Sequence, residues 1–314
     1  MNPEPSYPAK LLLFGEYSIL LGSSAIGMPI KSFKASLSFV DQQKEGLLLQ
    51  AEQSNMLLKK LCDHYLGKPE IFNQFLDLNR FKTDITQGLY LASTIPQRFG
   101  MGSSGALCAA IYGRYGFDGN VQYVDLNKDQ LIFLRKNFIQ MESYFHGKSS
   151  GFDPLVIYLQ KTILFKNDGG VVPIIFNSLF NNHMIELMLI DSGLPRSSAS
   201  FVQQFLDQFV PGGIILPVTE RLIGLTNSCI DNIASEKVDD FWSDLLKLSQ
   251  FQLQEMSHLI PAHLLLYWTE GLQSGLFALK LCGSGGGGFL TCFTRDKVGS
   301  VDYFRNREIG VVEV

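Results

Sequence analysis

The segment from residue 95 to residue 106 combines glycines, hydroxyl side chains and the start of a helix, a set that suits a phosphate ligand. Glycine lets a ligand approach the backbone closely, and the first N–H groups of a helix point at bound anions. The apolar run at 106–112 predicts a buried helix behind this turn. A simple helix cap is the alternative. The chemistry-bearing residues are Gly100, Met101, Gly102, Ser103, Ser104 and Gly105.

Two further segments point to a ligand. Lys10 stands directly before the apolar run 11–14, which predicts a buried strand from which a lysine can reach into a cleft. Residues 283–288 hold five glycines among six residues, between apolar runs. Each glycine weakens a strand by roughly 0.5–1 kcal/mol relative to alanine. A run this costly to stability indicates that the glycines have a function. The alternative is a flexible linker, which has polar flanks. The flanks here are apolar, so the run indicates that another group approaches the backbone closely.

In this order, the three segments resemble the motifs of the GHMP kinase superfamily, which includes galactokinase, homoserine kinase, mevalonate kinase and phosphomevalonate kinase. The resemblance implies that Lys10 lies near the reacting hydroxyl and that residues 100–105 wrap the phosphates of ATP. It also implies that the glycine run braces that loop, with Gly283, Gly285 and Gly286 at the nucleotide site. Gly105 and Pro154 depart from the usual alanine and asparagine of the family pattern.

The segment 141–153 resembles the part of mevalonate kinases in which a glutamate binds magnesium and an aspartate faces the substrate hydroxyl; here these are Glu142 and Asp153. On the same ground His146 is assigned to the substrate side. Apolar residues recur every three or four positions and predict a helix over 127–145. A carboxylate near a helix C-terminus favours a compensating cation. The alternative for Glu142 is a glutamate exposed to solvent on the helix surface. The alternative for Asp153 is an aspartate that only bonds the local backbone.

The segment 191–198 resembles a second mevalonate kinase segment, in which an arginine and a hydroxyl residue line the substrate side. Arg196 and Ser198 match it. An arginine fork suits the carboxylate of an acidic substrate. The alternative for the serine is that it caps a helix that begins at residue 199.

The chain reads as α/β (α+β). The resemblance implies the two-lobed GHMP kinase fold, with an N-terminal ribosomal-protein-S5-domain-2-like lobe, a C-terminal ferredoxin-like lobe and the active site between them. We expect an ATP-binding domain at 1–180 and a C-terminal domain at 181–314. Expected strands are 10–14, 26–30, 35–40, 155–159, 161–165, 171–176, 186–190, a pair around the glycine run, and 311–314. Besides the two helices above, expected helices are 53–65, 84–93, 198–209, 217–234, 237–256 and 262–274.

Composition sets bounds on the class of protein. The 314 residues are 46% hydrophobic and 18% charged, enough for a large core in two lobes. A net charge of −4 without a basic block gives no reason to expect nucleic acid or an anionic membrane surface. No apolar run reaches the roughly 18 residues of a membrane span. Five cysteines without paired spacing indicate neither disulfides nor zinc, and they predict a cytoplasmic protein. The histidines form no metal pattern.

The predicted activity is ATP- and Mg²⁺-dependent phosphorylation of a primary alcohol on a small hydroxy acid, with the 5-hydroxyl of mevalonate as first candidate. By resemblance, Ser104 and Glu142 hold magnesium, and Asp153 accepts the alcohol proton beside Lys10, which keeps it ionised. The alternatives are a phosphomevalonate, homoserine or sugar kinase, or a non-catalytic nucleotide-binding relative. Whether the chain forms a homodimer stays open.

Overall fold

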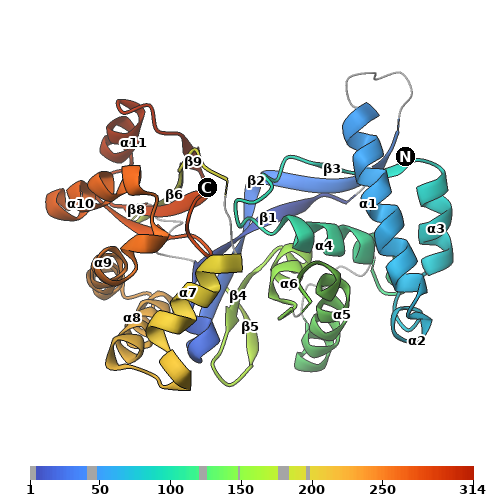
Figure 1. Cartoon of the computed structure of the whole chain (residues 1–314), viewed down its shortest axis with the longest axis horizontal. Coiled ribbons are helices and arrows are strands. Elements are labelled where there is room, and N and C mark those ends of the chain that lie inside the picture. Colours follow the sequence, from blue (N-terminus) through green and yellow to red (C-terminus); the bar gives the residue numbers. More distant parts are fainter. Residues whose placement is uncertain (1–4, 41–47, 120–125, 148, 176–183, 196–198) are drawn as a thin grey trace. The chain divides into compact units, whose positions relative to one another are not determined.

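The computed structural model of the chain describes residues 5–40, 48–119, 126–147, 149–175, 184–195 and 199–314 (Figure 1). The strands are β1 (Tyr7–Phe14), β2 (Ala25–Phe39), β3 (Leu89–Ser93), β4 (Thr162–Phe165), β5 (Val171–Ile174), β6 (Glu186–Asp191), β7 (Phe277–Leu281), β8 (Phe289–Thr294) and β9 (Val311–Glu313). The α-helices are α1 (Leu48–Leu66), α2 (Pro69–Phe72), α3 (Leu78–Thr86), α4 (Ser103–Tyr115), α5 (Lys128–His146), α6 (Phe152–Leu159), α7 (Ala199–Phe209), α8 (Pro217–Ala234), α9 (Val238–Glu255), α10 (Leu265–Ser274) and α11 (Lys297–Arg305). The α+β class is confirmed.

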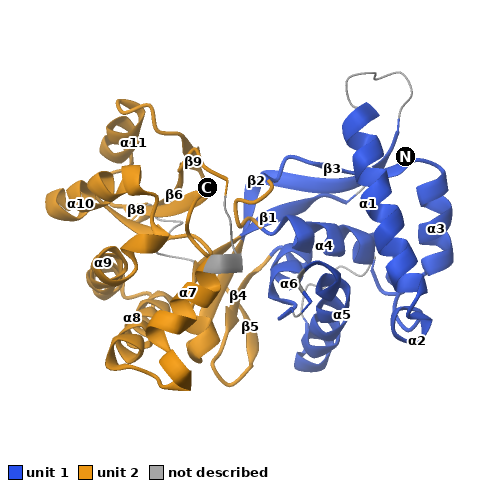
Figure 2. Cartoon of the chain, viewed as in Figure 1, with its two compact units in different colours: residues 1–10, 29–96, 102–160 blue, residues 11–28, 97–101, 161–314 orange. Residues whose placement is uncertain are grey.

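The chain divides into two compact units (Figure 2). Unit 1 comprises residues 1–10, 29–96 and 102–160, and unit 2 comprises residues 11–28, 97–101 and 161–314. Strands β1 and β2 therefore contribute residues to both units. The expected domain boundary between residues 180 and 181 lies outside the described residues and stays a prediction, as do the lobe types that the resemblance implies.

In unit 1, helices pack against strand β3 and against one another. Strand β3 pairs antiparallel with the end of β2, from Ala35 opposite Ser93 to Phe39 opposite Leu89. Helices α1 and α3 pack against β3, and α4 packs against α5 and α6 (Figure 1). Helix α4 is buried almost all round, because its small residues allow neighbours to approach from several sides.

Unit 2 is built on a four-stranded antiparallel sheet of order β7-β8-β6-β9. Every residue of β7 and β8 is buried, which explains why both read as apolar runs. Helices α9 and α10 pack against β7, and α8 packs against α9 (Figure 1). Strands β4 and β5 pair antiparallel, and β4 also pairs with residues 25–27 of β2.

Four expected elements differ from the structure. The strand expected at 155–159 is wrong: these residues belong to helix α6, because an apolar run alone does not separate a buried strand from a buried helix and Pro154 favours a helix start. The helix expected at 84–93 is wrong beyond Thr86, because Gly88 adopts a φ of 87° and β3 then pairs with β2. The two strands expected at 26–30 and 35–40 form the single strand β2. Helix α11 was not predicted.

The five cysteines, Cys62, Cys108, Cys229, Cys282 and Cys292, are all buried as free thiols. Burial raises the pKa of the Cys62 thiol to about 11. Among the described residues, no helix combines the length and the apolar character needed to cross a bilayer.

Candidate functional site

Helix α4 begins in a turn that only glycine fits. Gly102 caps the helix with a φ of 74°, a backbone conformation that other residues rarely adopt. A Cβ at this position would lie 2.8 Å from Cγ of Lys10 and 3.1 Å from Cδ1 of Ile157. The first intrahelical bond runs from the Ala106 N–H to the Gly102 carbonyl, at 2.8 Å. The N–H groups of residues 103–105 therefore precede the helical ladder, as an anion site requires.

A second helix, α6, begins beside the first. Gly151 caps it with a φ of 69°. The Ser149 hydroxyl accepts the Gly151 N–H at 2.9 Å, and the Ser150 hydroxyl accepts the Phe152 N–H at 3.3 Å. Asp153 follows in the first turn, so its carboxylate lies at the positive end of the helix dipole. The two serine hydroxyls hold the backbone of the turn before Asp153. The Asp153 carboxylate is not used in these bonds and can contact other partners.

Gly105 and Pro154, two of the departures from the family pattern, lie against each other. A Cβ on residue 105 would be 3.0 Å from the Pro154 nitrogen and 3.1 Å from both the carbonyl carbon and Cβ of Asp153. Glycine therefore lets the N-termini of α4 and α6 meet. This contact fixes the backbone of Asp153 next to the turn that carries Ser104.

Lys10 forms an ion pair with Asp153, with Nζ 2.9 Å from Oδ1. The lysine side chain is 8% exposed and the aspartate side chain 31% exposed. The stem of Lys10 passes Gly102, which explains why that glycine lacks room for a side chain. The structure thus brings together the two residues to which the sequence assigns the reaction, and it leaves the carboxylate accessible.

Glu142 lies on α5 with only 4% of its surface exposed, which excludes a solvated helix glutamate. The Ser149 hydroxyl donates to Oε2 of Glu142, and Ser104 also forms a side-chain hydrogen bond to it. Burial raises the pKa of Glu142 to about 7; the charge of Asp153 also raises it, and the two serines and Lys10 counteract the shift. Burial and the charge of Asp153 therefore raise the pKa of this carboxyl, which lies near the end of α5 as the sequence predicted.

We call Lys10, Ser104, Glu142, Ser149 and Asp153 the site cluster. It holds two carboxyl groups and one ammonium group, so it has an unbalanced negative charge when both carboxyls are ionised. Ser149 was missed by sequence reasoning, which interpreted residues 149–151 only as a turn. A hydroxyl two residues before the helix-capping glycine was the available signal.

The oxygen donors of the site cluster fit a magnesium ion. Mg²⁺ prefers oxygen ligands and usually takes only one or two carboxylates from the protein, alongside waters and substrate phosphates. A buried carboxyl whose pKa is raised to about 7 gains most from a cation that stabilises its ionised form. Within the described ranges, no three His, Cys, Asp or Glu side chains gather as a complete metal cage.

The glycine run lies in unit 2, and its close approaches are to protein atoms. A Cβ would lie 2.1 Å from the Phe201 ring at Gly286, 2.5 Å from the Leu259 carbonyl oxygen at Gly285 and 2.8 Å from the Leu194 carbonyl oxygen at Gly287. These contacts exclude a flexible linker. The nucleotide role of Gly283, Gly285 and Gly286 stays a prediction.

The proposed substrate side is described in part. Arg196 and Ser198 lie outside the described residues, and so does the side chain of His146, the last residue of α5. The segment just before Arg196 is described: the Gly288 N–H donates to the Leu194 carbonyl at 2.7 Å, and the Ser192 N–H donates to the Gly288 carbonyl at 2.9 Å. This segment is therefore held against the glycine run.

Comparison with known proteins finds similarity to mevalonate kinases. No family model matches the chain. Mevalonate kinase of Dictyostelium discoideum is 23% identical over 90% of this chain and 85% of the relative. Mevalonate kinase of Pyrococcus horikoshii is 24% identical over 90% of this chain and 86% of the relative. The solved structure of L. major mevalonate kinase in complex with R-mevalonate superposes with a TM-score of 0.63 and 16% identity, over all of this chain and 96% of that one.

The resemblance to the GHMP kinase superfamily, most of all to mevalonate kinase, is confirmed. At these identities the likeness to solved structures establishes the GHMP kinase fold. The roles of individual residues rest on the geometry of the site cluster.

Proposed function

We propose that the protein is an ATP-dependent kinase that phosphorylates the 5-hydroxyl of mevalonate. One observation carries the proposal: an accessible aspartate, paired with a buried lysine, stands where two helix N-termini meet. Phosphoryl transfer needs chiefly positioning and charge neutralisation, and this arrangement supplies both.

Asp153 is the group that meets the acceptor. Its carboxylate is the more exposed member of the ion pair with Lys10, so an incoming alcohol reaches the carboxylate first. In the proposed reaction Asp153 orients the hydroxyl and accepts its proton as the new O–P bond forms, while the bond between the γ-phosphorus of ATP and the β–γ bridging oxygen breaks and ADP leaves. Lys10 stands 2.9 Å away and offsets negative charge on the transferred phosphoryl group.

The start of α4 is the proposed phosphate site. The N–H groups of residues 103–105 face away from the helical ladder and would bind the phosphates of ATP. Ser104 and Glu142 would hold Mg²⁺, which neutralises phosphate charge when it is bound. Ser149 keeps the Glu142 carboxylate oriented through its hydrogen bond.

The choice of mevalonate rests on the relatives and on the sequence. Two relatives that match 90% of this chain are mevalonate kinases. Mevalonate is a hydroxy acid, and Arg196 would bind its carboxylate through the bidentate geometry that guanidinium groups favour.

The test is an assay of ADP release with purified protein, ATP and Mg²⁺, in which mevalonate, phosphomevalonate, galactose and homoserine are compared side by side. We expect mevalonate to give the highest kcat/KM. A higher kcat/KM with another acceptor would show that mevalonate is not the preferred substrate, while the proposed phosphoryl transfer would stand. ATP binding without transfer to any acceptor would contradict the kinase and favour a non-catalytic relative.

A further inference from the structure

The turn that follows the Lys10 strand carries backbone strain at a residue that is not glycine. Tyr17 adopts a φ of 63°, in a region that residues with a side chain rarely occupy. Gly15, two residues earlier, has a φ of 112°, and a Cβ there would lie 2.4 Å from the Cβ of Ala25. Strain of this kind persists only where surrounding contacts enforce it, and it is concentrated at functional positions.

The strained conformation places the Tyr17 side chain on the glycine run. Its hydroxyl donates to the Ser284 carbonyl at 2.5 Å, across a separation of 267 residues. Its ring packs against Phe205 with the centroids 4.5 Å apart. The backbone of the second residue of the run is thereby fixed from one side.

A buried ion pair fixes the strand that leads into the run. Nζ of Lys280 lies 2.6 Å from Oε1 of Glu16 and donates to the Leu281 carbonyl at 2.7 Å. The lysine side chain is 0% exposed and the glutamate side chain 2% exposed. Removing two charges from water is costly, and apolar residues of similar volume often give equal or greater stability. The pair therefore calls for a role besides stability.

The opposite end of the run meets the predicted phosphate loop. A Cβ at Gly288 would lie 3.1 Å from Cα of Phe99 and 3.2 Å from its carbonyl oxygen. The rings of Phe99 and Phe289 pack with centroids 5.0 Å apart. Phe99 directly precedes Gly100, whose φ is 78°, so the backbone of the loop turns immediately beyond this contact.

We propose that Glu16, Tyr17 and Lys280 are positioning residues for the phosphate loop. Together they hold the glycine run at its start, and the run in turn sets the backbone of residues 97–101 through Gly288. The ligand whose binding depends on them is the phosphate chain of the nucleotide. This inference rests on the proposed function for its kinetic measurement only.

The first test is Tyr17→Phe, which removes one hydroxyl and keeps the ring. Losing a single hydrogen bond predicts that the KM for ATP rises about threefold to tenfold, with the KM for the acceptor unchanged. Tyr303→Phe is the matched control, because the Tyr303 hydroxyl also donates to a partner in unit 2, the Glu270 carboxylate. The control should leave both KM values unchanged.

The second test replaces the buried pair by apolar residues, Glu16→Leu with Lys280→Met. The exposed pair of Arg295 and Asp239, at 2.7 Å, supplies the control double variant Arg295→Met with Asp239→Asn. Amide hydrogen exchange of residues 97–101 is measured for both variants and for the wild type. We expect faster exchange there, and a higher KM for ATP, in the Glu16–Lys280 variant only.

The inference is overturned if the Tyr17 and Glu16–Lys280 variants fold with wild-type exchange at residues 97–101 and an unchanged KM for ATP. It is overturned equally if the KM values for ATP and acceptor rise together with general loss of stability, which is what a purely structural role predicts. If the wild type transfers phosphate to no acceptor, the proposed function fails, and the exchange measurement still decides the positioning role. If the double variant does not fold, Tyr17→Phe decides it.

Discussion

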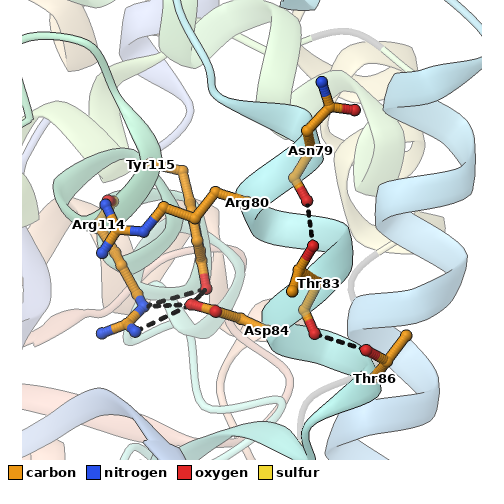
Figure 3. Close-up of polar contacts among 7 residues, drawn as sticks. All are labelled: Asn79, Arg80, Thr83, Asp84, Thr86, Arg114 and Tyr115. Carbon is orange, nitrogen blue, oxygen red and sulfur yellow. Dashed lines mark hydrogen bonds and ion pairs between the residues drawn. The ribbon is translucent and has the colours of Figure 1, made fainter.

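Unit 1 contains two clusters of charged side chains. They are built from similar groups but differ in the ratio of carboxyl groups to cationic groups. In the site cluster, two carboxyl groups share one lysine, and burial with Asp153 raises the pKa of Glu142 to about 7. The other cluster, which we call the anchor cluster, comprises Asp84, Arg114 and Tyr115 (Figure 3). It joins α3 to the end of α4 with one carboxylate and one guanidinium group in contact.

In the anchor cluster one carboxylate contacts one guanidinium group and one phenol. Asp84 Oδ2 lies 2.9 Å from an Arg114 terminal nitrogen and accepts the Arg114 Nε–H at 3.0 Å (Figure 3). The same oxygen accepts the Tyr115 hydroxyl at 2.8 Å. Burial, together with the bond to Asp84, raises the pKa of Tyr115, so the phenol stays a neutral donor. Arg80 adds a bond to the Arg114 carbonyl at 3.2 Å.

This contrast separates an ionic cluster that holds structure from one that binds a ligand. In a cluster whose positive and negative charges are equal in number, the charged groups pair with one another and need no further ion. An unbalanced one leaves a carboxyl with a perturbed pKa, which is typical of functional sites. The two lie at opposite ends of α4, so the same helix is anchored at its C-terminus and available for chemistry at its N-terminus.

The largest effect should come from Asp153→Asn. The amide keeps the size of the side chain but accepts no proton from the alcohol, so kcat should fall about 10²- to 10⁴-fold, while the Kd for ATP stays close to wild type. Steady-state kinetics and equilibrium nucleotide binding measure the two quantities. The control in the anchor cluster, Asp84→Asn, should lower stability and leave kcat per folded molecule unchanged. Unchanged turnover in the Asp153 variant would remove this residue from the reaction.

The next effect concerns pH and Glu142. Because the folded-state pKa of about 7 exceeds the ordinary value of 4.5, the folded protein binds more protons than the unfolded chain between these values. The free energy of unfolding should therefore fall as pH rises through this range, by about 3 kcal/mol from this group.

Glu142→Gln removes that titration and should be more stable than the wild type at pH 8, with a smaller difference at pH 5. Urea unfolding at both pH values measures the change. Added Mg²⁺ should stabilise the wild type at pH 8 more than the variant, because only the wild type has the Glu142 carboxylate at the proposed magnesium site. Parallel pH profiles of the two proteins would show that Glu142 titrates normally.

A smaller effect is expected for Arg114→Met, which breaks the anchor cluster. Asp84 would lose its cation while 9% exposed, so we expect a loss of about 2 kcal/mol in the free energy of unfolding. Chemical denaturation measures it, and the KM for ATP and kcat should remain at wild-type values. A large fall in kcat with normal stability would place the anchor cluster in the mechanism and remove the contrast between the clusters.

The smallest effect is expected for Gly105→Ala. Alanine favours the helix by about 1 kcal/mol, but its Cβ would press on the backbone of Asp153 and Pro154. We therefore expect little change in stability and a few-fold decrease in kcat. Gly224→Ala, in α8 where a Cβ has open space, is the control and should stabilise the protein without affecting kcat. A Gly105 variant with full activity would show that the helix contact does not tune Asp153.

Much of the site could be predicted from the sequence, because its chemistry is local. The turn before α4 shows its glycines and hydroxyls in adjacent positions, and Lys10 stands at the start of a recognisable apolar run. The meeting of Lys10 with Asp153 could be inferred only through the family resemblance, since 143 positions separate them in the chain. The structure supplies that contact as an ion pair.

The remaining features depend on tertiary packing. The α6 segment reads equally as strand or helix, and burial on α4 decides between them. The roles of Ser149 and Arg114 require knowledge of which carboxylate each side chain contacts in the fold. The glycine run shows the same limit: its composition predicts close backbone approach, but the approaching atoms belong to side chains and carbonyls scattered through unit 2.

The concealed thiols give the molecule a built-in reporter of opening. A thiol must be both reachable and deprotonated to react, and in the native fold all five cysteines are buried, with the pKa of Cys62 raised to about 11. Alkylating reagents will therefore modify chiefly those molecules that have opened locally or unfolded. Because cysteines occur in both units, the order in which individual thiols become labelled reveals which unit opens more readily.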